Sequence, residues 1–492
     1  MSIAVTHEAP PDYRPDQPSG VLTPMQRLEA LCDPGSLHVI RSEVHSRRMG
    51  DRARAGDGVI GAAGRVDGQP VFCYAQDTSF AGGSLGEAHA DTVVRVLRLA
   101  GQAQVPVVAF IASAGARMQE GLAALGGYGR IFQENVRLSG KVPQISIIAG
   151  TSAGGGSYSP ALTDFVVMTE DASMFLTGPG IVKEVMGEDV SASDLGGARV
   201  HERNGVSQFT VTDAAAGARL ARDLLSHLPP HSGRDAEPHT ARPGLRGDPG
   251  RVVPAEPRKV YDVRDVIGRI VDGGDLVEVS PRWARNMVVG FARLEGRSVG
   301  IVANQPRYLG GVLDADAAQK AARFVRTCNT FNTPLVVLVD TPGFMPGTRQ
   351  ESAGVIRHGA KLLHAFAEAT VPRLTVVLRK AYGGAYITMN SKDLGAHFTF
   401  AWPDAELGVM GAGQAVSIIN RRELAAAEDP VAERGRLANE YAGEHLLAQT
   451  AAREGFVDEI IEPADTRARL DWGLQTLAGR ERPALGRGNI PL

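Results

Sequence analysis

Two pairs of consecutive glycines are the residues of this chain best suited to chemistry. Gly154-Gly155 follows the largely apolar residues 145–149, and Gly383-Gly384 follows the largely apolar residues 374–378. Glycine lets the backbone approach a ligand closely, and the first amide groups of a helix have no acceptor within that helix. A turn of this kind can hold a negative oxygen that develops during a reaction, which is what an oxyanion hole does.

A second glycine turn follows the preceding strand in each copy. These turns are Ser113-Ala114-Gly115-Ala116 and Thr341-Pro342-Gly343-Phe344. Two turns at adjacent strand ends can supply converging donors, so we predict that both contribute to the oxyanion hole. The alternative is that the glycines only permit close packing of helix on strand, and for a single turn that alternative is favoured. Four turns at matching places favour a site.

The chain contains the same pattern twice. Residues 105–110 resemble residues 333–338, and residues 142–148 resemble residues 371–377, with an offset of 228 or 229 positions. The glycine pairs have the same offset. A constant offset indicates two copies of one domain, so a site built at the glycine pair should occur twice. An enzyme with two similar pockets is suited to transfer between two bound partners.

A serine hydrolase is a competing interpretation. Gly150-Thr151-Ser152-Ala153-Gly154 matches the G-x-S-x-G pattern of a nucleophile elbow between a strand and a helix. The second copy, however, has Ala381 at the position that matches Ser152. What the copies share is therefore the backbone and not a hydroxyl group, and short motifs of this kind match by accident.

Composition excludes several other classes. The chain has 492 residues, of which 43% are hydrophobic and 22% charged, with a formal net charge of −3. This charge gives no field to gather nucleic acid, and no apolar run approaches the length of a membrane span. The three cysteines, Cys32, Cys73 and Cys328, stand far apart, which predicts no zinc site and a cytoplasmic protein. Two prolines lie between His227 and His231, so we predict that these histidines lie on a surface loop and bind no metal.

Strands, glycine turns and helices alternate in β-α-β order with apolar strands, which indicates an α/β fold with helices covering each sheet. The sequence predicts helices after Thr23, after Ser84 as N-cap and over residues 263–271, and hairpins around Asp67-Gly68 and Glu295-Gly296. We divide the chain into a disordered arm (1–20), an N-terminal domain (21–226), a proline-rich linker (227–257) and a C-terminal domain (258–492).

The chain resembles the carboxyltransferase (β) subunits of biotin-dependent acyl-CoA carboxylases, the acetyl- and propionyl-CoA carboxylase group. The resemblance covers nearly everything from Thr23 to Leu492. In the first half it is carried by Gly82-Gly83-Ser84-Leu85-Gly86-Glu87, Gly115-Ala116-Arg117-Met118-Gln119-Glu120-Gly121, Tyr158-Ser159-Pro160-Ala161 and Leu195-Gly196-Gly197-Ala198. In the second half it is carried by Ala303-Asn304-Gln305-Pro306, Ala321-Ala322-Arg323-Phe324, Pro342-Gly343-Phe344, Arg379-Lys380-Ala381-Tyr382-Gly383-Gly384-Ala385-Tyr386 and Gly488-Asn489-Ile490-Pro491-Leu492.

The resemblance implies two tandem crotonase-like (ClpP/crotonase) domains of the β-β-α superhelix type. It also implies that the N-terminal domain of one subunit faces the C-terminal domain of another, usually within a hexamer. Acyl-CoA then lies against the N-terminal domain and carboxybiotin against the C-terminal domain. Biotin is expected on a separate α subunit with the biotin carboxylase and biotin carrier, since this chain has neither a P-loop nor a Met-Lys-Met biotinylation segment.

Matched residue by residue, the resemblance implies four catalytic positions. Gly154 and Gly155 would hold the thioester oxygen as it becomes an enolate, and Gly384 and Ala385 would hold the ureido oxygen of biotin. The remaining positions implied by the resemblance are Ala114, Gly115, Ala116, Gly156 and Tyr158 for acyl-CoA, Gly343, Phe344 and Gly383 for biotin, and Ile387 for acyl-chain specificity.

The predicted activity is carboxyl transfer from carboxybiotin to acetyl-CoA or propionyl-CoA, which gives malonyl-CoA or methylmalonyl-CoA. An apolar residue at position 387 resembles family members that accept acetyl-CoA. The alternatives are a transcarboxylase or biotin-dependent decarboxylase subunit, a crotonase-type hydratase and a non-catalytic scaffold. A hydratase needs paired carboxylates, for which only Glu120 is suggestive, and helix-surface solvation explains Glu120 equally well.

Overall fold

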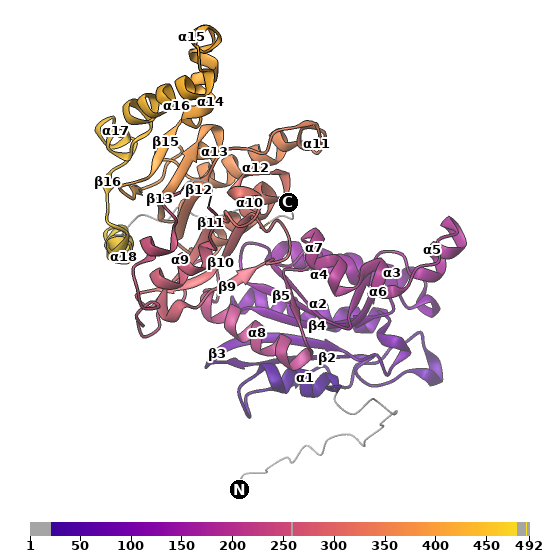
Figure 1. Ribbon diagram of the computed structural model, residues 1–492. Helices are drawn as coiled ribbons and strands as arrows, with labels where there is room; N and C mark the ends of the chain where they lie inside the picture. Colours follow the sequence, from indigo (N-terminus) through magenta and orange to yellow (C-terminus); the bar gives the residue numbers. More distant parts are fainter. Residues whose placement is uncertain (1–20, 257–258, 480–488, 490–492) are drawn as a thin grey trace.

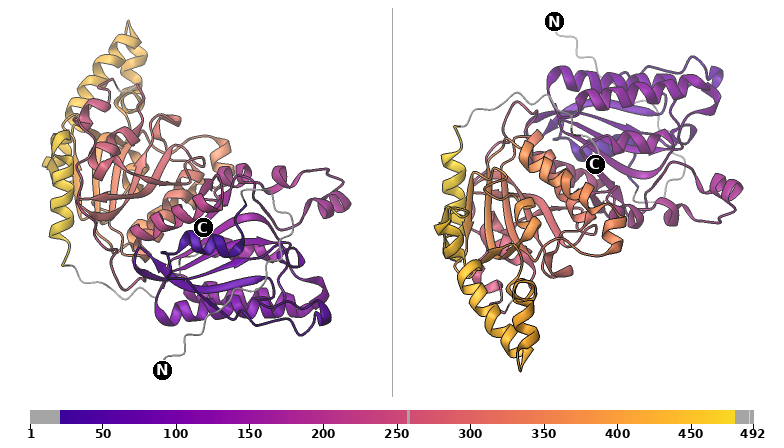
Figure 2. Two further views of the ribbon diagram at one scale, coloured as in Figure 1. Left: turned by 90° about the horizontal axis from the view of Figure 1, so that it is seen from below. Right: turned by 90° about the horizontal axis from the view of Figure 1, so that it is seen from above.

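The computed structural model describes residues 21–256, 259–479 and 489. The predicted arm, residues 1–20, and most of the C-terminal tail lie outside the described residues. Two lobes lie side by side, one coloured indigo to magenta and the other orange to yellow (Figure 1). The same two lobes are distinct in the views from below and above (Figure 2).

Each lobe contains one eight-stranded mixed sheet. The first sheet has the order β1-β2-β3-β4-β5-β6-β8, with β7 paired to β5. The second has the order β16-β14-β13-β12-β11-β10-β9, with β15 paired to β13. The strands of the first sheet are β1 (His38–Ile40), β2 (Val59–Val66), β3 (Gln69–Gln76), β4 (Val107–Ser113), β5 (Gln144–Ala153), β6 (Phe165–Thr169), β7 (Ser173–Phe175) and β8 (Phe209–Val211). Those of the second are β9 (Val277–Val279), β10 (Met287–Leu294), β11 (Arg297–Asn304), β12 (Leu335–Thr341), β13 (Arg373–Tyr382), β14 (Phe398–Ala401), β15 (Glu406–Gly408) and β16 (Glu459–Ile460).

The two sheets repeat one plan, as the sequence predicts. Each contains an antiparallel hairpin, β2–β3 or β10–β11, followed by parallel strands. The register of the two central parallel strands shifts at matching places, between Ile111 and Ser113 in the first sheet and between Val339 and Thr341 in the second. The duplication therefore extends to an irregularity beside each glycine turn.

Helices cover both faces of the sheets. In the first half they are α1 (Pro24–Leu31), α2 (Glu87–Ala103), α3 (Leu122–Leu138), α4 (Gly155–Ala161), α5 (Pro179–Met186), α6 (Ala192–Gly196), α7 (Ala198–Asn204) and α8 (Ala214–His227). In the second half they are α9 (Val263–Ile270), α10 (Ala315–Thr330), α11 (Thr348–Ser352), α12 (Val355–Glu368), α13 (Gly383–Thr388), α14 (Ala412–Ile419), α15 (Arg421–Ala426), α16 (Pro430–Tyr441), α17 (Ala448–Arg453) and α18 (Thr466–Thr476).

Alternation along β4 shows how the core is built. Val107, Ala109 and Ile111 pack in the cluster that includes α2, whereas Val108 and Phe110 pack in the cluster that includes α1 and α8. Successive side chains of a strand point to opposite faces, so an all-apolar strand requires cover on both. The second cluster continues into the C-terminal half through contacts such as Phe165 with Phe291, whose ring centroids lie 5.9 Å apart. The two halves thus share one apolar core.

Helix starts confirm one N-cap prediction and contradict another. Thr23 caps α1 in a capping box with Gln26, as the sequence predicts. Ser84, however, does not cap α2, because that helix begins at Glu87 after Gly86. The amides of its first turn donate to side chains distant in sequence: Glu87 to Glu120 and His89 to Asp57.

The segment predicted as a linker is packed against the C-terminal half. The His239 amide donates to the Gly296 carbonyl at 2.9 Å, and the Leu245 amide donates to the Gly268 carbonyl at 2.9 Å. His227, predicted on a surface loop, is the last residue of α8 and is buried with its ring 6.0 Å from that of Phe291. That prediction was wrong for His227 because the helix extends to the residue before Leu228-Pro229 and carries the ring into the shared core.

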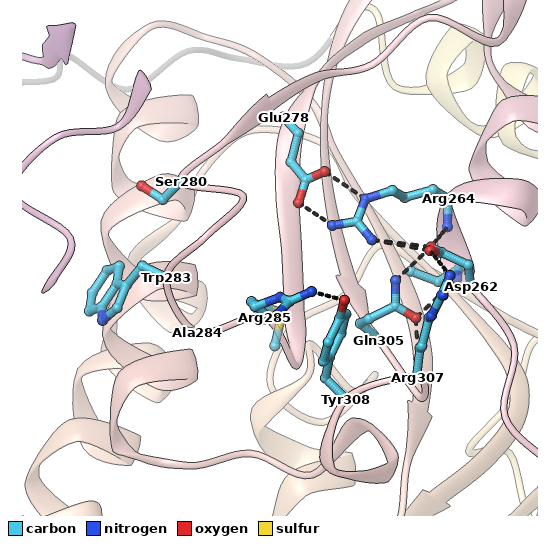
Figure 3. A network of polar contacts seen from close by, with 12 residues as sticks. Asp262, Arg264, Glu278, Ser280, Trp283, Ala284, Arg285, Gln305, Arg307 and Tyr308 are labelled. Atoms are coloured by element: carbon cyan, nitrogen blue, oxygen red, sulfur yellow. Dashed lines mark hydrogen bonds and ion pairs between the residues drawn. The ribbon is translucent and has the colours of Figure 1, made fainter. Parts of the chain in front are cut away.

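The loop between β9 and β10 also joins the halves. The buried Lys320 ammonium donates to the carbonyls of Ser280, Trp283 and Met287 at 2.7–2.9 Å. The loop in turn contacts the first half, since the Ser280 amide donates to the Gln208 carbonyl. Figure 3 shows Ser280, Trp283 and Ala284 on this loop, beside the ion pair of Arg264 with Glu278.

Acid is expected to destabilise the fold through a buried histidine. Burial, aided by the charge of Arg117, lowers the pKa of His89 to about 3, from an ordinary 6.5. Below pH 6.5 the unfolded chain binds a proton that the folded chain does not, so the free energy of unfolding falls as the pH falls from 6.5 towards 3. At pH 5 the loss is about 2 kcal/mol for this one group. Urea unfolding at pH 7.5 and pH 5 should show this loss, and His89→Gln should reduce it.

A matched control for that experiment is His364→Gln, since the His364 side chain is 68% exposed. The control should keep the full pH dependence. An equal loss of stability with pH in His89→Gln and in the unaltered chain would contradict the assignment to His89.

Candidate functional site

The first glycine turn joins β5 to α4. Gly154 lies between them with φ 58° and ψ −126°, a conformation that only glycine adopts without strain. The strand places the turn at the carboxyl end of the parallel sheet, beside β4 and β7. Gly154 and Gly155 are partly exposed, so a ligand can reach this backbone.

The hydrogen bonds of the turn correct the sequence prediction for Gly154. Its N–H donates to the carbonyl of Phe175 at 3.0 Å and is therefore used within the fold. The Ser157 amide closes the first turn of α4 on the Gly154 carbonyl at 3.0 Å. Gly155 and Gly156 precede it as the first residues of α4 and have no acceptor within the helix. Of these two residues, Gly155 is partly exposed and Gly156 is buried.

Side chains leave no room at these two glycines. A methyl group on Gly155 would lie 2.7 Å from ring atoms of Tyr128, and one on Gly156 would lie 2.9 Å from Oγ of Ser152. Tyr128 is itself buried, with its hydroxyl 3.4 Å from that of Ser113. Tyr158, one turn into α4, is half exposed and packs edge-on against Phe132. The backbone at position 155 can thus keep this place only if the residue there has no side chain.

The second turn of the first half serves the fold rather than supplying donors. The Ala114 amide donates to the Gly82 carbonyl at 3.0 Å, and the Gly115 amide donates to Oγ of Ser113 at 3.2 Å. The prediction that both turns supply converging donors is therefore wrong for these two residues. The turn does lie beside the first one, since a methyl group on Gly115 would be 3.3 Å from the carbonyl oxygen of Ala153.

The corresponding turn of the second half has the same construction. The Gly343 amide donates to Oγ1 of Thr341 at 3.3 Å, and the Gly343 carbonyl accepts from the amide of Leu313 at 3.0 Å. The ring of Phe344, the next residue, approaches the second glycine pair, since it lies 3.8 Å from where a methyl group on Gly384 would be. The structure thus places Phe344, and with it the adjacent Gly343, next to Gly384, and all three were predicted on the biotin side.

The second glycine pair joins β13 to α13. Gly383 has φ 60°, and Gly384 and Ala385 follow as residues of the first turn of α13. Gly384 is exposed and Ala385 is buried. Tyr382, just before the pair, donates its hydroxyl to Glu406, and burial raises the pKa of that hydroxyl. This turn is more open than the first one.

Comparisons with known proteins identify the family of this chain. The sequence profile described as "Carboxyl transferase domain" matches residues 15–490. The chain belongs to the carboxyl transferase family. It is 47% identical over 483 residues to the methylmalonyl-CoA carboxyltransferase 12S subunit of Propionibacterium freudenreichii subsp. shermanii, covering 96% of this chain and 92% of the relative. It is also 47% identical over 484 residues to the propionyl-CoA carboxylase carboxyltransferase subunit of Haloferax mediterranei, covering 96% and 94%.

Solved structures extend the likeness to the fold. A transcarboxylase 12S crystal structure, described as a hexamer with methylmalonyl-CoA and methylmalonic acid bound, matches with a TM-score of 0.91 at 47% identity and covers 96% of this chain and 93% of that one. The predicted crotonase-like fold and carboxyltransferase class are therefore confirmed. The chain is a transferase enzyme of this family.

The family assignment leaves no role for Ser152 as a nucleophile. Its side chain is fully buried, and within the described residues its Oγ has no hydrogen-bond partner. A serine nucleophile needs an exposed hydroxyl bonded to a base. The sequence allowed Glu120 to be a solvated residue on a helix surface. In the structure Glu120 is instead buried, with its carboxylate 2.8 Å from the guanidinium of Arg117.

In the part of the chain that the structure describes, no cluster of three or more His, Cys, Asp or Glu side chains has the arrangement of a metal site. No described helix combines the length and apolar character needed to cross a bilayer.

One residue that the sequence did not single out as functional is Asn489. Its side-chain amide donates to Asp164 at 2.9 Å in the first half and to Thr327 at 3.1 Å in the second. Its backbone also bonds with Ser139 and Arg323. Only the terminal motif marked this residue in the sequence, and pattern alone could not place it between the halves.

Proposed function

We propose that this carboxyltransferase moves a carboxyl group from carboxybiotin, carried on a separate protein, to the α-carbon of acetyl-CoA or propionyl-CoA. The products are malonyl-CoA and methylmalonyl-CoA. The observation that carries this proposal is the glycine turn repeated in both halves of a chain whose relatives are named for propionyl-CoA and methylmalonyl-CoA. One turn suits the thioester and the other suits biotin.

On the acyl side the amides of Gly155 and Gly156 hold the thioester oxygen. That oxygen gains negative charge when the α-proton leaves, and an enolate accepts stronger hydrogen bonds than a carbonyl does. Each donor of this kind lowers the barrier by about 3 kcal/mol. The Gly154 amide supports the turn through Phe175 and is not one of these donors. Acyl-CoA contacts are assigned to Ala114, Gly115, Ala116 and Tyr158.

On the biotin side the residues present fit a ureido group. The amides of Gly384 and Ala385 belong to the first turn of α13, and Gly384 is exposed next to the ring of Phe344. We assign Gly343, Phe344 and Gly383 to biotin contacts as well. When bound, carboxybiotin supplies the carboxyl group and the base that removes the α-proton. The chain itself binds, orients and shields the reacting atoms, so no side-chain base is required.

Exposed apolar helices support an assembly in which unlike halves face one another. In the first half Ile181, Val185 and Met186 of α5 are exposed, and in the second half Ile418 and Ile419 of α14 are exposed. These helices project at opposite ends of the molecule (Figure 1). Large exposed apolar patches mark interaction sites. We assign them to contacts between copies of this chain in a hexamer, and a biotin carboxylase/biotin carrier α subunit completes the enzyme.

Free biotin tests the function without that α subunit. The oligomer, incubated with biotin and malonyl-CoA or methylmalonyl-CoA, should release acetyl-CoA or propionyl-CoA at a rate that depends on biotin. Chromatography of the acyl-CoA products measures it. Release that is the same with and without biotin, or none with either substrate, would overturn the proposal.

Ile387 is expected to set the acyl preference. Its side chain is 46% exposed beside the second glycine pair, so it is available to a ligand and is not core. Ile387→Asp should change the ratio of turnover on acetyl-CoA to that on propionyl-CoA by 10-fold or more, since one methylene in a pocket is worth about 1–3 kcal/mol. Ile387→Val is the matched control and should keep the ratio. Unchanged ratios in both variants would show that Ile387 does not determine the acyl preference.

A transcarboxylase or decarboxylase subunit is the second candidate. It is favoured by the names of two relatives, the 12S subunit above and the methylmalonyl-CoA decarboxylase subunit α of Propionigenium modestum, which is 44% identical over 485 residues. The same pockets run these reactions in other directions. Reconstitution with ATP, bicarbonate, a biotin carboxylase, its biotin carrier and acetyl-CoA or propionyl-CoA distinguishes them, because the carboxylase is the candidate expected to produce malonyl-CoA or methylmalonyl-CoA from this mixture.

A further inference from the structure

Arg117 is a buried cation close to the first glycine turn. Its side chain is fully buried, with Nη1 2.6 Å from Oδ1 of Asp57 and 2.8 Å from Oε1 of Glu120. Its Nη2 donates to the carbonyls of Ser84 at 2.9 Å and Asp57 at 3.1 Å. Breaking a buried ion pair leaves an uncompensated charge, so these groups hold one another in a fixed geometry.

The two carboxylates also hold the first turn of α2. Oδ2 of Asp57 accepts from the amide of His89 at 2.9 Å, and Oε2 of Glu120 accepts from the amide of Glu87 at 2.7 Å. Oε1 of Glu120 accepts from the hydroxyl of Ser46 at 2.7 Å. Arg117 thereby fixes segments that are distant in sequence around one charge.

A short chain of contacts leads from Arg117 to the oxyanion turn. The Arg117 amide donates to the Leu85 carbonyl at 2.9 Å, and the Leu85 amide donates to the Gly115 carbonyl at 2.8 Å. The Cα of Gly115 faces the carbonyl of Ala153, the residue before Gly154. The position of Arg117 therefore sets where the Ala114–Ala116 turn stands, and that turn packs against the backbone leading to Gly155.

The second half keeps the turn but not the cation. Met345 stands 228 positions after Arg117, and its amide donates to the Leu313 carbonyl at 2.7 Å, as that of Arg117 does to Leu85. The fold can therefore form this turn without a guanidinium. A buried arginine of the second half, Arg379, instead pairs with Asp340 on β12 and binds the carbonyl of Lys259. The guanidinium at position 117 belongs to the acyl side alone.

We infer that Arg117, paired with Asp57 and Glu120, is a positioning residue for the acyl-side oxyanion turn. It holds the turn at residues 114–116 against the strand end, so that the Gly155 and Gly156 amides are fixed before the thioester binds. This inference rests on the proposed function. A misplacement of about 1 Å at a reacting centre can lower a rate about 100-fold.

The test replaces Arg117 by the residue that the second half uses. In the assay with free biotin and saturating methylmalonyl-CoA or malonyl-CoA, Arg117→Met should lower kcat about 100-fold. The KM for acyl-CoA should rise as well, because the displaced turn at residues 114–116 carries acyl-CoA contacts. Arg117→Lys should not restore kcat, since an ammonium cannot bridge both carboxylates and two carbonyls. The melting temperature of each variant is measured alongside.

The matched control is Arg222→Met. Arg222 also ties distant segments through Asp33, Asp67 and the Leu31 carbonyl, but it lies at the hairpin end of the strands, away from the glycine turns. It should lose thermal stability and keep kcat. If Arg117→Met behaves like this control, Arg117 is a structural anchor only and the inference fails.

If Arg117→Met does not fold, a second variant, Gly86→Ala, disturbs the same ion pairs without removing a charge. A methyl group on Gly86 would lie 2.4 Å from Nη1 of Arg117 and 2.5 Å from Oε1 of Glu120. Gly86→Ala should thus displace the guanidinium and lower kcat at saturating acyl-CoA, whereas full activity would overturn the inference. Failure of the unaltered chain to use biotin would instead refute the proposed function, so the two failures are distinguishable.

Discussion

Replacing Gly155 by alanine is expected to lower the rate of carboxyl transfer at least about 100-fold. The added methyl group would lie 2.7 Å from the ring of Tyr128. That ring is buried and packs against Phe132 at a centroid distance of 5.9 Å, so it cannot move aside without disturbing α3. The backbone at Gly155 must shift instead, and its amide then misses the developing enolate oxygen. Steady-state kinetics with free biotin and methylmalonyl-CoA or malonyl-CoA measure the loss.

The control for this variant is Gly129→Ala, next to Tyr128 on α3. A methyl group there meets no atom within 4 Å, and alanine stabilises an exposed helix by up to about 1 kcal/mol relative to glycine. This variant should keep full activity. If Gly155→Ala also keeps it while folding and assembling normally, the amide of Gly155 is not an oxyanion donor.

Replacing Gly384 by proline is expected to lower transfer about 100- to 1000-fold, the cost of removing one oxyanion-hole donor. Proline has no N–H but is tolerated in the first turn of a helix, where Gly384 lies. The position is exposed, and the nearest atoms to an added Cβ are ring carbons of Phe344 at 3.8 Å. The loss is therefore expected from the missing donor rather than from a clash.

Gly384→Ala is the matched control because it keeps the N–H and has room for its methyl group. It should retain activity within about threefold, and both variants should bind acyl-CoA as the unaltered chain does, since acyl-CoA is assigned to the other half. Isothermal titration with propionyl-CoA checks the binding. Equal activity of the proline and alanine variants would show that this amide does no chemistry.

The duplicated architecture could be predicted from the sequence because it depends on local signals. Buried strands such as β5 and β13 have largely apolar central residues, and each strand leads directly into glycines. The hairpins around Asp67-Gly68 and Glu295-Gly296 have turn residues that tolerate positive φ, which is 49° at both Asp67 and Glu295. The constant offset then predicts that the second half repeats the first, down to the paired turns.

Contacts between distant segments could not be predicted in this way. The Gly154 amide is used by Phe175, which arrives beside β5 only because β7 pairs with that strand. Arg117 and Glu120 look like surface residues of a helix start, yet Arg117 pairs with both Glu120 and Asp57 in the interior. His227 enters the core through the shared packing of both halves. Each of these contacts depends on which distant segments pack together, and the spacing of residues in the sequence does not predict that packing.

Carboxyl transfer as proposed requires the two glycine turns to meet across a boundary between copies of the chain. The most direct test is a crystal structure of the assembled enzyme with propionyl-CoA bound. The thioester oxygen should lie about 3 Å from the Gly155 amide nitrogen, with the Gly384 and Ala385 amides of a neighbouring copy opening into the same cleft. A thioester held elsewhere, or two glycine turns that open on separate surfaces with no second copy between them, would contradict the account.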